Sequence, residues 1–322
     1  MALGLDSGGT STRCVITTLD GRPLGRGRGP GASTQSSADP AGALSGTITA
    51  ALADADVPAS AVVTAVVGMA GAGSGRRPAA LAALADAARR SGLPRTPELV
   101  TDLETSYAAG TAAERGLLLI SGTGAITAWL EDGVVRHRAD GYGWLLGDAG
   151  SAVWQGRRAV EAVLAGLDGR GPKTALTTPV ISALTGNEPD DALGPDEQAQ
   201  RVLAAVYAAA PAELGRAAPA VRDLADSDEI AASICADAVS ALMLAVEAVL
   251  RRAGSPSVPA VVLGGSVLTT DGPVADGVRA RLTELTGVTP VAALDAALGA
   301  VALALRSAGR LDADTYQHLT AG

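Results

Sequence analysis

The sequence is poor in aromatic residues and in cysteine, and it contains no long basic run. Aromatic residues make up 2% of the 322 residues, and phenylalanine is absent. The core must therefore be built from alanine, valine, leucine and isoleucine, because hydrophobic residues still make up 48% of the chain. With 18% charged residues, this composition excludes a disordered chain. The length suits two domains better than one simple core.

The formal net charge is −9, and no basic run is longer than pairs such as Arg89–Arg90 and Arg251–Arg252. Both pairs stand near predicted helix C-termini, where cations suit the helix dipole. A nucleic-acid surface needs larger basic patches, so we expect no nucleic-acid partner. A phosphate ligand is still compatible with this charge, because backbone N–H groups and Mg²⁺ can hold it.

The two cysteines, Cys14 and Cys235, lie in a strand-like and a helix-like run and are expected to be buried thiols. No secretory signal precedes Gly4, and we find no apolar stretch that spans a bilayer. We therefore expect a soluble cytoplasmic protein with no membrane partner.

The pattern of predicted elements is repeated along the chain. Residues 2–6 and 12–19 predict strands joined by a glycine turn, and Asp20-Gly21 leads into a third strand at 23–28. The same order returns at 116–121, 125–131 and 134–137. This echo predicts two related lobes, each beginning with an antiparallel meander.

Periodicity and apolar runs predict the remaining elements. Helices are expected at 40–55, 78–91, 103–113, through most of 151–253, at 273–286 and at 294–307, and strands at 61–69, 98–101, 259–263 and 288–291. The tail from 312 to 322 reads as a frayed helical end.

Two glycine turns have the design of phosphate-binding loops. The first glycine hairpin (residues 6–12, DSGGTST) and the second (residues 121–124, SGTG) each follow a buried strand. Glycine lets the backbone approach a phosphate, and successive N–H groups form an anion nest. Asp6 at the strand end could hold Mg²⁺ directly or through water. Taken alone, each turn is equally consistent with an ordinary turn.

A third glycine turn and an acidic strand end complete this set. Gly264-Gly265-Ser266 follows an apolar strand, and its small residues would admit a flat adenosine. Thr101-Asp102 stands between a strand and a helix. A carboxylate there could orient an acceptor hydroxyl and take its proton. In isolation, Asp102 reads more simply as a helix N-cap.

The glycine-rich loop at residues 141–151, GYGWLLGDAGS, is poor material for a regular element. Its four glycines, two aromatic residues and one acid favour a substrate loop in which Asp148 binds sugar hydroxyls. The simpler interpretation is that Asp148 or Ser151 caps the next helix, and both roles are compatible.

Together, these motifs resemble the BadF/BadG/BcrA/BcrD ATPase family, and within it the N-acetylglucosamine kinases. The matching segments are DSGGTST (6–12), VTDLE (100–104), LISGTGA (119–125), DGYGWLLGDAGSAVW (140–154), LGGSV (263–267) and AALGAVALAL (296–305). The resemblance implies an α/β, two-lobed actin-like ATPase (ribonuclease H-like) fold, with a mixed sheet and flanking helices in each lobe and ATP in the interlobe cleft. The N-terminal lobe would be 1–115, completed by a C-terminal helix at about 295–322, and the C-terminal lobe 116–294.

The resemblance also implies roles for individual residues. Asp102 would be the catalytic base, and Asp6 would organise Mg²⁺. ATP and its phosphates would be contacted by Gly8, Gly9, Thr10, Thr12, Gly122, Thr123, Gly124, Gly264, Gly265 and Ser266, with Thr270 near the nucleotide. The sugar would be contacted by Gly71, Asp102, Gly141, Tyr142, Gly143 and Asp148. The implied activity is ATP-dependent phosphorylation of the 6-hydroxyl of N-acetylglucosamine or a related amino sugar, by an enzyme that is expected to form a homodimer.

One departure concerns the sugar site. Kinases of this family usually place an asparagine after the third strand, whereas residues 29–37 read GPGASTQSS. Ser33 or Gln35 would have to substitute. Glucosamine and N-acetylmuramic acid therefore remain alternative substrates, and a non-catalytic sugar sensor or ATPase regulator of the same fold remains an alternative function.

Two other functional classes are disfavoured by the cysteines. Dehydratase activators of the same superfamily bridge an iron–sulfur cluster with two cysteines from each subunit, but Cys14 and Cys235 do not lie in exposed glycine-rich loops. Related kinases that contain zinc need a cluster of cysteine and histidine residues, and this sequence has none.

Overall fold

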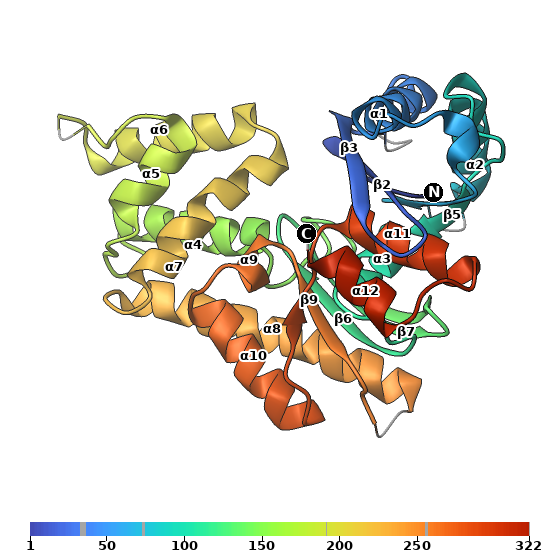
Figure 1. The fold of residues 1–322 in the computed structure, drawn as a ribbon. Coiled ribbons are helices and arrows are strands. Elements are labelled where there is room, and N and C mark those ends of the chain that lie inside the picture. Colours follow the sequence, from blue (N-terminus) through green and yellow to red (C-terminus); the bar gives the residue numbers. More distant parts are fainter. Residues whose placement is uncertain (33–36, 73–74, 191, 255–256, 322) are drawn as a thin grey trace. The chain divides into compact units, whose positions relative to one another are not determined.

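The computed structural model describes residues 1–32, 37–72, 75–190, 192–254 and 257–321 (Figure 1). The chain forms two compact units. The first contains residues 1–115, 130–135 and 291–322, and the second contains residues 116–129 and 136–290. Ser33 and Gln35, which we considered for sugar binding, lie outside the described residues.

The first unit is built on a five-stranded sheet with the order β3-β2-β1-β4-β5. Strand β1 pairs antiparallel with β2 and parallel with β4, so the sheet is mixed as expected. The turn after β1 reverses the chain directly, whereas β4 and β5 are each reached through a helix. The strands are β1 (Ala2–Ser7), β2 (Ser11–Thr17), β3 (Pro23–Pro30), β4 (Thr64–Met69) and β5 (Glu98–Thr101).

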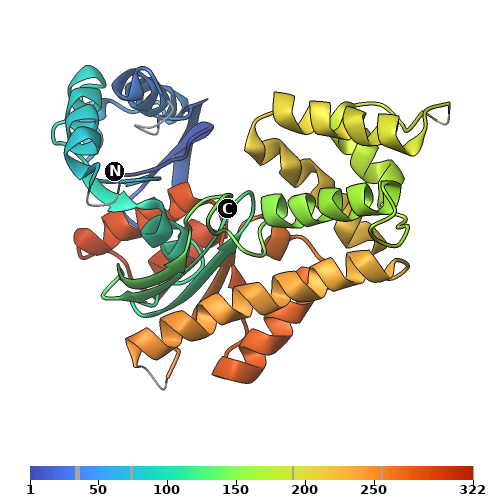
Figure 2. The same ribbon diagram turned by 180° about the vertical axis from the view of Figure 1, so that it is seen from behind.

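Helices cover both faces of this sheet, because its strands alternate two apolar sets of side chains (Figures 1 and 2). Leu3 and Leu5 face α1 and α2, whereas Ala2 and Val15 face α11. The helices of the unit are α1 (Pro40–Asp54), α2 (Arg77–Arg90), α3 (Asp102–Ala108), α11 (Ala296–Ser307) and α12 (Ala313–Thr320), with a short 3₁₀ turn at Ala59–Ala61.

Helix α11 packs so closely on its neighbours that main-chain atoms are in contact. A Cβ atom at Gly4 of β1 would lie 2.3 Å from the backbone nitrogen of Val301. A Cβ atom at Gly299 of α11 would lie 1.9 Å from the carbonyl oxygen of Thr105 in α3. Glycine at these two positions therefore lets α11 contact the backbone of both β1 and α3 directly.

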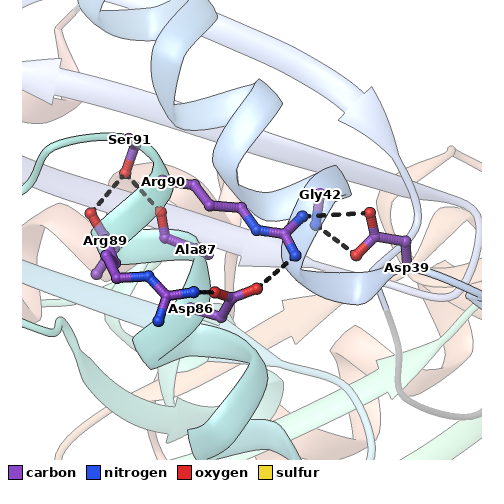
Figure 3. Close-up of polar contacts among 8 residues, drawn as sticks. Asp39, Gly42, Asp86, Ala87, Arg89, Arg90 and Ser91 are labelled. Carbon is purple, nitrogen blue, oxygen red and sulfur yellow. Dashed lines mark hydrogen bonds and ion pairs between the residues drawn. The ribbon is translucent and has the colours of Figure 1, made fainter.

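Ion pairs join the start of α1 to the end of α2 (Figure 3). Asp39 caps α1 by accepting the N–H of Gly42 at 2.9 Å. Arg90 lies 3.4 Å from Asp39 and 2.6 Å from Asp86, and Arg89 also pairs with Asp86. The prediction that Arg89 and Arg90 end a helix is confirmed.

The second five-stranded sheet has the order β10-β9-β6-β7-β8, and β6 pairs parallel with β9. Its strands are β6 (Gly116–Ser121), β7 (Ala125–Glu131), β8 (Val134–Asp140), β9 (Val261–Gly264) and β10 (Val291–Ala292). The helices of the second unit are α4 (Ala152–Leu167), α5 (Thr177–Thr185), α6 (Pro195–Ala208), α7 (Ala218–Leu224), α8 (Glu229–Ala253), α9 (Ser266–Thr269) and α10 (Pro273–Thr286), with a 3₁₀ segment at Pro211–Ala217.

Helix α8 is long and apolar enough to contradict the expectation that no stretch of this sequence could span a bilayer. By length and composition it qualifies as a bilayer-spanning helix, although we found no such stretch in the sequence. Its apolar face, which includes Cys235, Leu242 and Val246, is buried in the core of the second unit with Leu117 and Trp129. A buried core helix of a soluble protein meets the same criterion, so α8 is no sign of a membrane protein by itself.

Several element boundaries also differ from the prediction. Helix α3 ends at Ala108, before Gly110, whereas we expected it to reach residue 113. Strand β4 begins at Thr64, because Pro58 precedes a 3₁₀ turn. The C-terminal tail is a capped helix and not a frayed end: Asp312 accepts the N–H of Thr315 at 2.8 Å, and Leu319 of α12 is buried.

Candidate active site

The first glycine hairpin joins β1 to β2 and leaves its tip exposed. The N–H of Gly8 donates to the carbonyl of Ser11 at 2.9 Å, which closes the turn. Gly9, Thr10 and Ser11 are exposed. Thr12 is fully buried, and its hydroxyl donates to the carbonyl of Pro30 at 2.8 Å. Thr10 is thus available to a ligand, whereas Thr12 supports the hairpin from within the fold.

Asp6 is the first residue of this hairpin, and it is paired with Arg13. The two residues stand opposite each other in the β1–β2 register, and Arg13 Nη2 lies 2.9 Å from Asp6 Oδ2. Burial raises the pKa of Asp6 above its ordinary value, and the hydrogen bond and charge of Arg13 partly offset this. Asp6 is therefore a largely buried carboxylate with an internal counter-ion.

Asp102 is the first residue of α3, and it is not the N-cap. Thr101 caps the helix: its hydroxyl accepts the N–H of Glu104 at 3.4 Å, while Glu104 Oε2 accepts the N–H of Thr101 at 2.7 Å. This reciprocal capping box bonds the N–H groups of Thr101 and Glu104 without the carboxylate of Asp102. The simpler interpretation of Asp102 as a helix cap is therefore wrong.

Asp102 lies near Asp6, because β1, β4 and β5 are neighbouring parallel strands: Asp6 is the penultimate residue of β1, and Asp102 directly follows β5. Burial raises the pKa of Asp102, and the negative charge of Asp6 raises it further, whereas hydrogen bonds from the N–H groups of Asp102 and Leu103 partly offset this. Among the described residues, no basic side chain forms an ion pair with Asp102. A carboxylate with a raised pKa and no cation attached can accept a proton from a hydroxyl group.

Gly71 also belongs to the first unit. It follows β4, is exposed, and has a positive φ of 73°. The first unit thus brings together the first glycine hairpin, including Asp6, and Asp102 at one edge of its sheet. The turn at Gly71, which follows β4, lies at the same edge.

In the second unit, the second glycine hairpin is joined to the start of α4. The N–H of Gly122 donates to the carbonyl of Gly124, and the N–H of Ala152 donates to the carbonyl of Gly122 at 2.8 Å. Thr123 at the tip is exposed. Ser121 is buried and donates through Oγ to the carbonyl of Gly150 at 3.1 Å. These bonds hold the hairpin, the glycine-rich loop and α4 together.

The turn Gly264-Gly265-Ser266 lies directly beside this hairpin. Gly265 has a φ of 81°, and a Cβ atom there would lie 2.3 Å from the carbonyl oxygen of Ser121. A neighbouring cavity of about 180 Å³ is lined by Ser266, Val267 and Thr270, by Gln155 of α4, and by Arg222 of α7. The second and third glycine motifs are therefore neighbours, and a cavity large enough for a nucleobase adjoins them.

The glycine-rich loop is shaped by two acids in the left-handed region, Asp140 (φ 64°) and Asp148 (φ 54°). Asp140 accepts the N–H groups of Asp148 at 2.7 Å and Ala149 at 2.9 Å. Asp148 in turn accepts the N–H of Gly143 at 3.3 Å. Sequence reasoning gave Asp140 no role, although an Asp-Gly pair at the start of the loop was a visible turn signal.

The outer part of this loop is apolar and exposed. Tyr142 is 64% and Leu146 80% exposed, and Trp144 is also exposed. Ser151, and not Asp148, caps α4 by accepting the N–H of Trp154 at 3.2 Å. Asp148 is therefore free of a capping role. Burial raises its pKa, whereas the N–H groups of Ala125 and Gly143 lower it.

Whether the protein can hold Mg²⁺ depends on the carboxylate and other donor side chains near the glycine hairpins. Among the described residues, no group of three or more histidine, cysteine, aspartate or glutamate side chains is arranged to hold a metal ion. Mg²⁺ that travels with a nucleotide needs fewer protein ligands, because one or two carboxylates and the phosphates hold it. Asp6, beside the first glycine hairpin, fits this kind of site.

The model of the BadF/BadG/BcrA/BcrD ATPase family matches residues 3–304 of the chain. The protein belongs to this ATPase family.

Relatives of this family member include sugar kinases. An N-acetyl-D-glucosamine kinase of Dictyostelium discoideum is 30% identical over 176 residues, which are 52% of this chain and 51% of that protein. An N-acetylmuramic acid/N-acetylglucosamine kinase of Clostridium acetobutylicum is 35% identical over 86 residues, or 27% of this chain and 28% of that protein. The chain thus matches about half or less of the length of these curated relatives.

Solved structures match over nearly the whole ATPase-family chain. A proposed N-acetylglucosamine kinase from Chromobacterium violaceum has a TM-score of 0.74 and 28% identity, covering 94% of this chain and 98% of that one. A ROK hexokinase from Thermus thermophilus has a TM-score of 0.54 and 18% identity, covering 96% and 99%. The actin-like ATPase fold with two mixed sheets is therefore confirmed.

The cysteines of this family member are both buried. Cys14 is 1% exposed in β2, and Cys235 is 3% exposed in α8. Burial raises the pKa of both thiols, that of Cys235 to about 11. Iron–sulfur ligation requires accessible thiolates, so the prediction of buried structural thiols is confirmed and a cluster-bearing activator is disfavoured.

Proposed function

We propose that the protein is an ATP-dependent kinase that phosphorylates the 6-hydroxyl group of N-acetylglucosamine or a related amino sugar. The observation that carries this proposal is Asp102: a half-buried carboxylate near Asp6, with a pKa raised by desolvation, at the start of a helix that is capped by Thr101. Membership of the ATPase family and the sugar kinases among its relatives support the same function.

In the proposed reaction, Asp102 accepts the proton of the sugar hydroxyl as that oxygen attacks the γ-phosphate. Burial keeps this carboxylate basic enough for the task. Thr10 and Thr123, which are exposed at the tips of the two glycine hairpins, are proposed to bind phosphate oxygens through their hydroxyls and N–H groups. Convergence of the two hairpins on one triphosphate stays a prediction.

Asp6 would hold Mg²⁺ directly or through water, and the bound ion would neutralise charge on the phosphates. The cavity beside Ser266 and Thr270 is proposed to receive the nucleoside, because it adjoins the second glycine hairpin. Asp148, held at the base of the glycine-rich loop, is proposed to bind sugar hydroxyls together with Gly141, Tyr142 and Gly143. Most of the catalytic effect in such a site comes from alignment of the reactants.

N-acetylmuramic acid is a second candidate substrate, because the Clostridium relative that matches part of the chain carries that activity in its name. Glucosamine is a third, since the family's usual asparagine is missing from residues 29–37. A cytoplasmic homodimer remains our proposal for the setting in which the protein works.

The deciding experiment measures ADP release with ATP, Mg²⁺ and a panel of N-acetylglucosamine, glucosamine, N-acetylmuramic acid and glucose. We expect release that depends on an amino sugar, and a product with phosphate on the 6-oxygen by NMR. Incubation without sugar controls for ATP hydrolysis. Sugar binding without any sugar-dependent ADP release would favour the non-catalytic sensor instead.

A further inference from the structure

Arg13 stands between two carboxylates of the first unit. Its Nη2 lies 2.9 Å from Asp6 Oδ2, and its Nη1 lies 3.5 Å from Asp295 Oδ1. Arg26 approaches the other oxygen of Asp295 at 3.7 Å. Asp295 also caps α11 by accepting the N–H of Ala297 at 3.1 Å. One guanidinium group therefore has two acceptors, one of which is the proposed Mg²⁺ ligand.

Among the described residues, Arg13 is the only cationic side chain that forms an ion pair with Asp6. Asp102 and Asp295 both lie close enough to Asp6 for their negative charges to repel that of its carboxylate. Arg26 is bound to Asp295, and Arg28 stands opposite Arg13 in the β2–β3 register without an ion pair to Asp6. The Asp6 side chain is only 13% exposed. A carboxylate that is so little hydrated needs a partner charge when no metal is bound.

Mg²⁺ and Arg13 would compete for the same group. Mg²⁺ requires a near-ideal octahedral set of oxygen ligands, which are usually one or two carboxylates, phosphate oxygens and several water molecules. A guanidinium group at 2.9 Å from Oδ2 adds positive charge and fills part of that space. Asp295 offers the guanidinium another acceptor without movement of the backbone, because Nη1 already faces it.

We propose that Arg13 is the internal counter-ion of the nucleotide-free site: it occupies Asp6 until the Mg²⁺ that accompanies ATP replaces it, and its guanidinium then rests on Asp295 alone. This proposal rests on the proposed kinase function. Arg13 is thus a positioning residue that sets how much Mg²⁺ the protein requires. It keeps the end of β1 and the first glycine hairpin in place while the site is empty.

The test titrates Mg²⁺ into protein saturated with ADP and measures heat by calorimetry, so that no turnover is needed. In Arg13→Gln, the competitor is removed but a hydrogen-bonding side chain is kept. We expect the Mg²⁺ concentration for half-saturation to fall about fivefold, because that ratio corresponds to the usual free-energy contribution of one partly exposed ion pair. Arg26→Gln is the matched control, because it removes a charge from the same network without touching Asp6, and it should change the value less than about twofold.

Asp295→Asn tests the second acceptor. Asparagine caps helices as well as aspartate does, so α11 should be kept. The guanidinium then has no second carboxylate, and the required Mg²⁺ concentration should rise. An unchanged or raised requirement in Arg13→Gln, or equal effects of Arg13→Gln and Arg26→Gln, would overturn the proposal. If the wild-type protein binds no ADP, the kinase proposal itself fails, and the role of Arg13 falls with it.

Discussion

Thr101 and Glu104 exchange two hydrogen bonds at the start of α3, at 3.4 Å and 2.7 Å, and this exchange leaves the carboxylate of Asp102 without a capping role. The capping of α3 and the proposed role as catalytic base are therefore assigned to different residues. Substitutions can separate them.

Asp102→Asn should lower kcat by about 10²- to 10⁴-fold, the usual contribution of a general base, and change sugar affinity little. Its thermal stability should not fall, because the capping box remains. Thr101→Ala should show the opposite pattern, with a loss of about 1 kcal/mol of stability. ADP-release kinetics, sugar calorimetry and thermal unfolding measure these quantities. A near-normal kcat in Asp102→Asn would remove the base assignment.

The raised pKa of Asp102 predicts a pH effect of defined sign. A base works in its ionised form, so kcat should fall about tenfold per pH unit below that raised pKa. For stability, the folded state binds the proton more tightly than the unfolded state does. The contribution of Asp102 is thus favourable at acid pH and lost as the pH rises through its folded pKa.

Consequently, the difference in Tm between Asp102→Asn and the wild type should shift in favour of the variant as the pH rises from acid to neutral. Thermal unfolding across that range measures the difference directly. A Tm difference between variant and wild type that stays constant with pH would contradict the raised pKa of Asp102.

Asp148 and Asp140 should differ in the consequence of their substitution. Asp148→Asn should raise the sugar KM about tenfold or more, because the charge that assists the hydrogen bond to the sugar is lost, with little change in stability, because the amide oxygen can still accept the N–H of Gly143. Asp140→Ala should raise KM and also cost about 1–3 kcal/mol of stability, since two N–H groups of the loop lose their acceptor. Steady-state kinetics and urea unfolding separate the two effects. Equal stability losses in both variants would contradict the division of roles.

Gly265 and Gly287 form a matched pair for backbone strain. Both have positive φ, but only a Cβ atom at Gly265 meets backbone, at 2.3 Å from Ser121, whereas the space around Gly287 is open. Gly287→Ala should cost about 1 kcal/mol. Gly265→Ala should cost about 3 kcal/mol or more and weaken ADP binding, because the second glycine hairpin must move. Similar costs, measured by urea unfolding, would refute the close contact.

Cys14 and Cys235 should be inert in the native protein. Their burial and raised pKa values leave almost no thiolate at neutral pH. A thiol-specific chromogenic reagent should label neither residue until denaturant is added, and purified protein should contain no iron. A brown protein with reactive thiols in the native state would revive the iron–sulfur alternative.

Local patterns were sufficient to predict most of the strands and the mixed sheets, because hairpin turns such as Asp20-Gly21 and continuous apolar runs are encoded within a few residues. The capping role of Thr101 was also within reach, since Thr-x-x-Glu is a local signature. The anchoring role of Asp140 and the bridge from Arg13 to Asp295 were not. Both depend on residues that are brought together only when the loop closes or when α11 packs on the sheet.

The close packing of α11 has a mechanical consequence. At Gly4 and Gly299 this helix touches the backbone of β1 and of α3, so neither element can slide past it without a collision between main chains. Asp6 is the penultimate residue of β1, and Asp102 is the first residue of α3. The packing of α11 should therefore restrict changes in the spacing between these two carboxylates, the proposed Mg²⁺ ligand and the proposed base, when ligands bind.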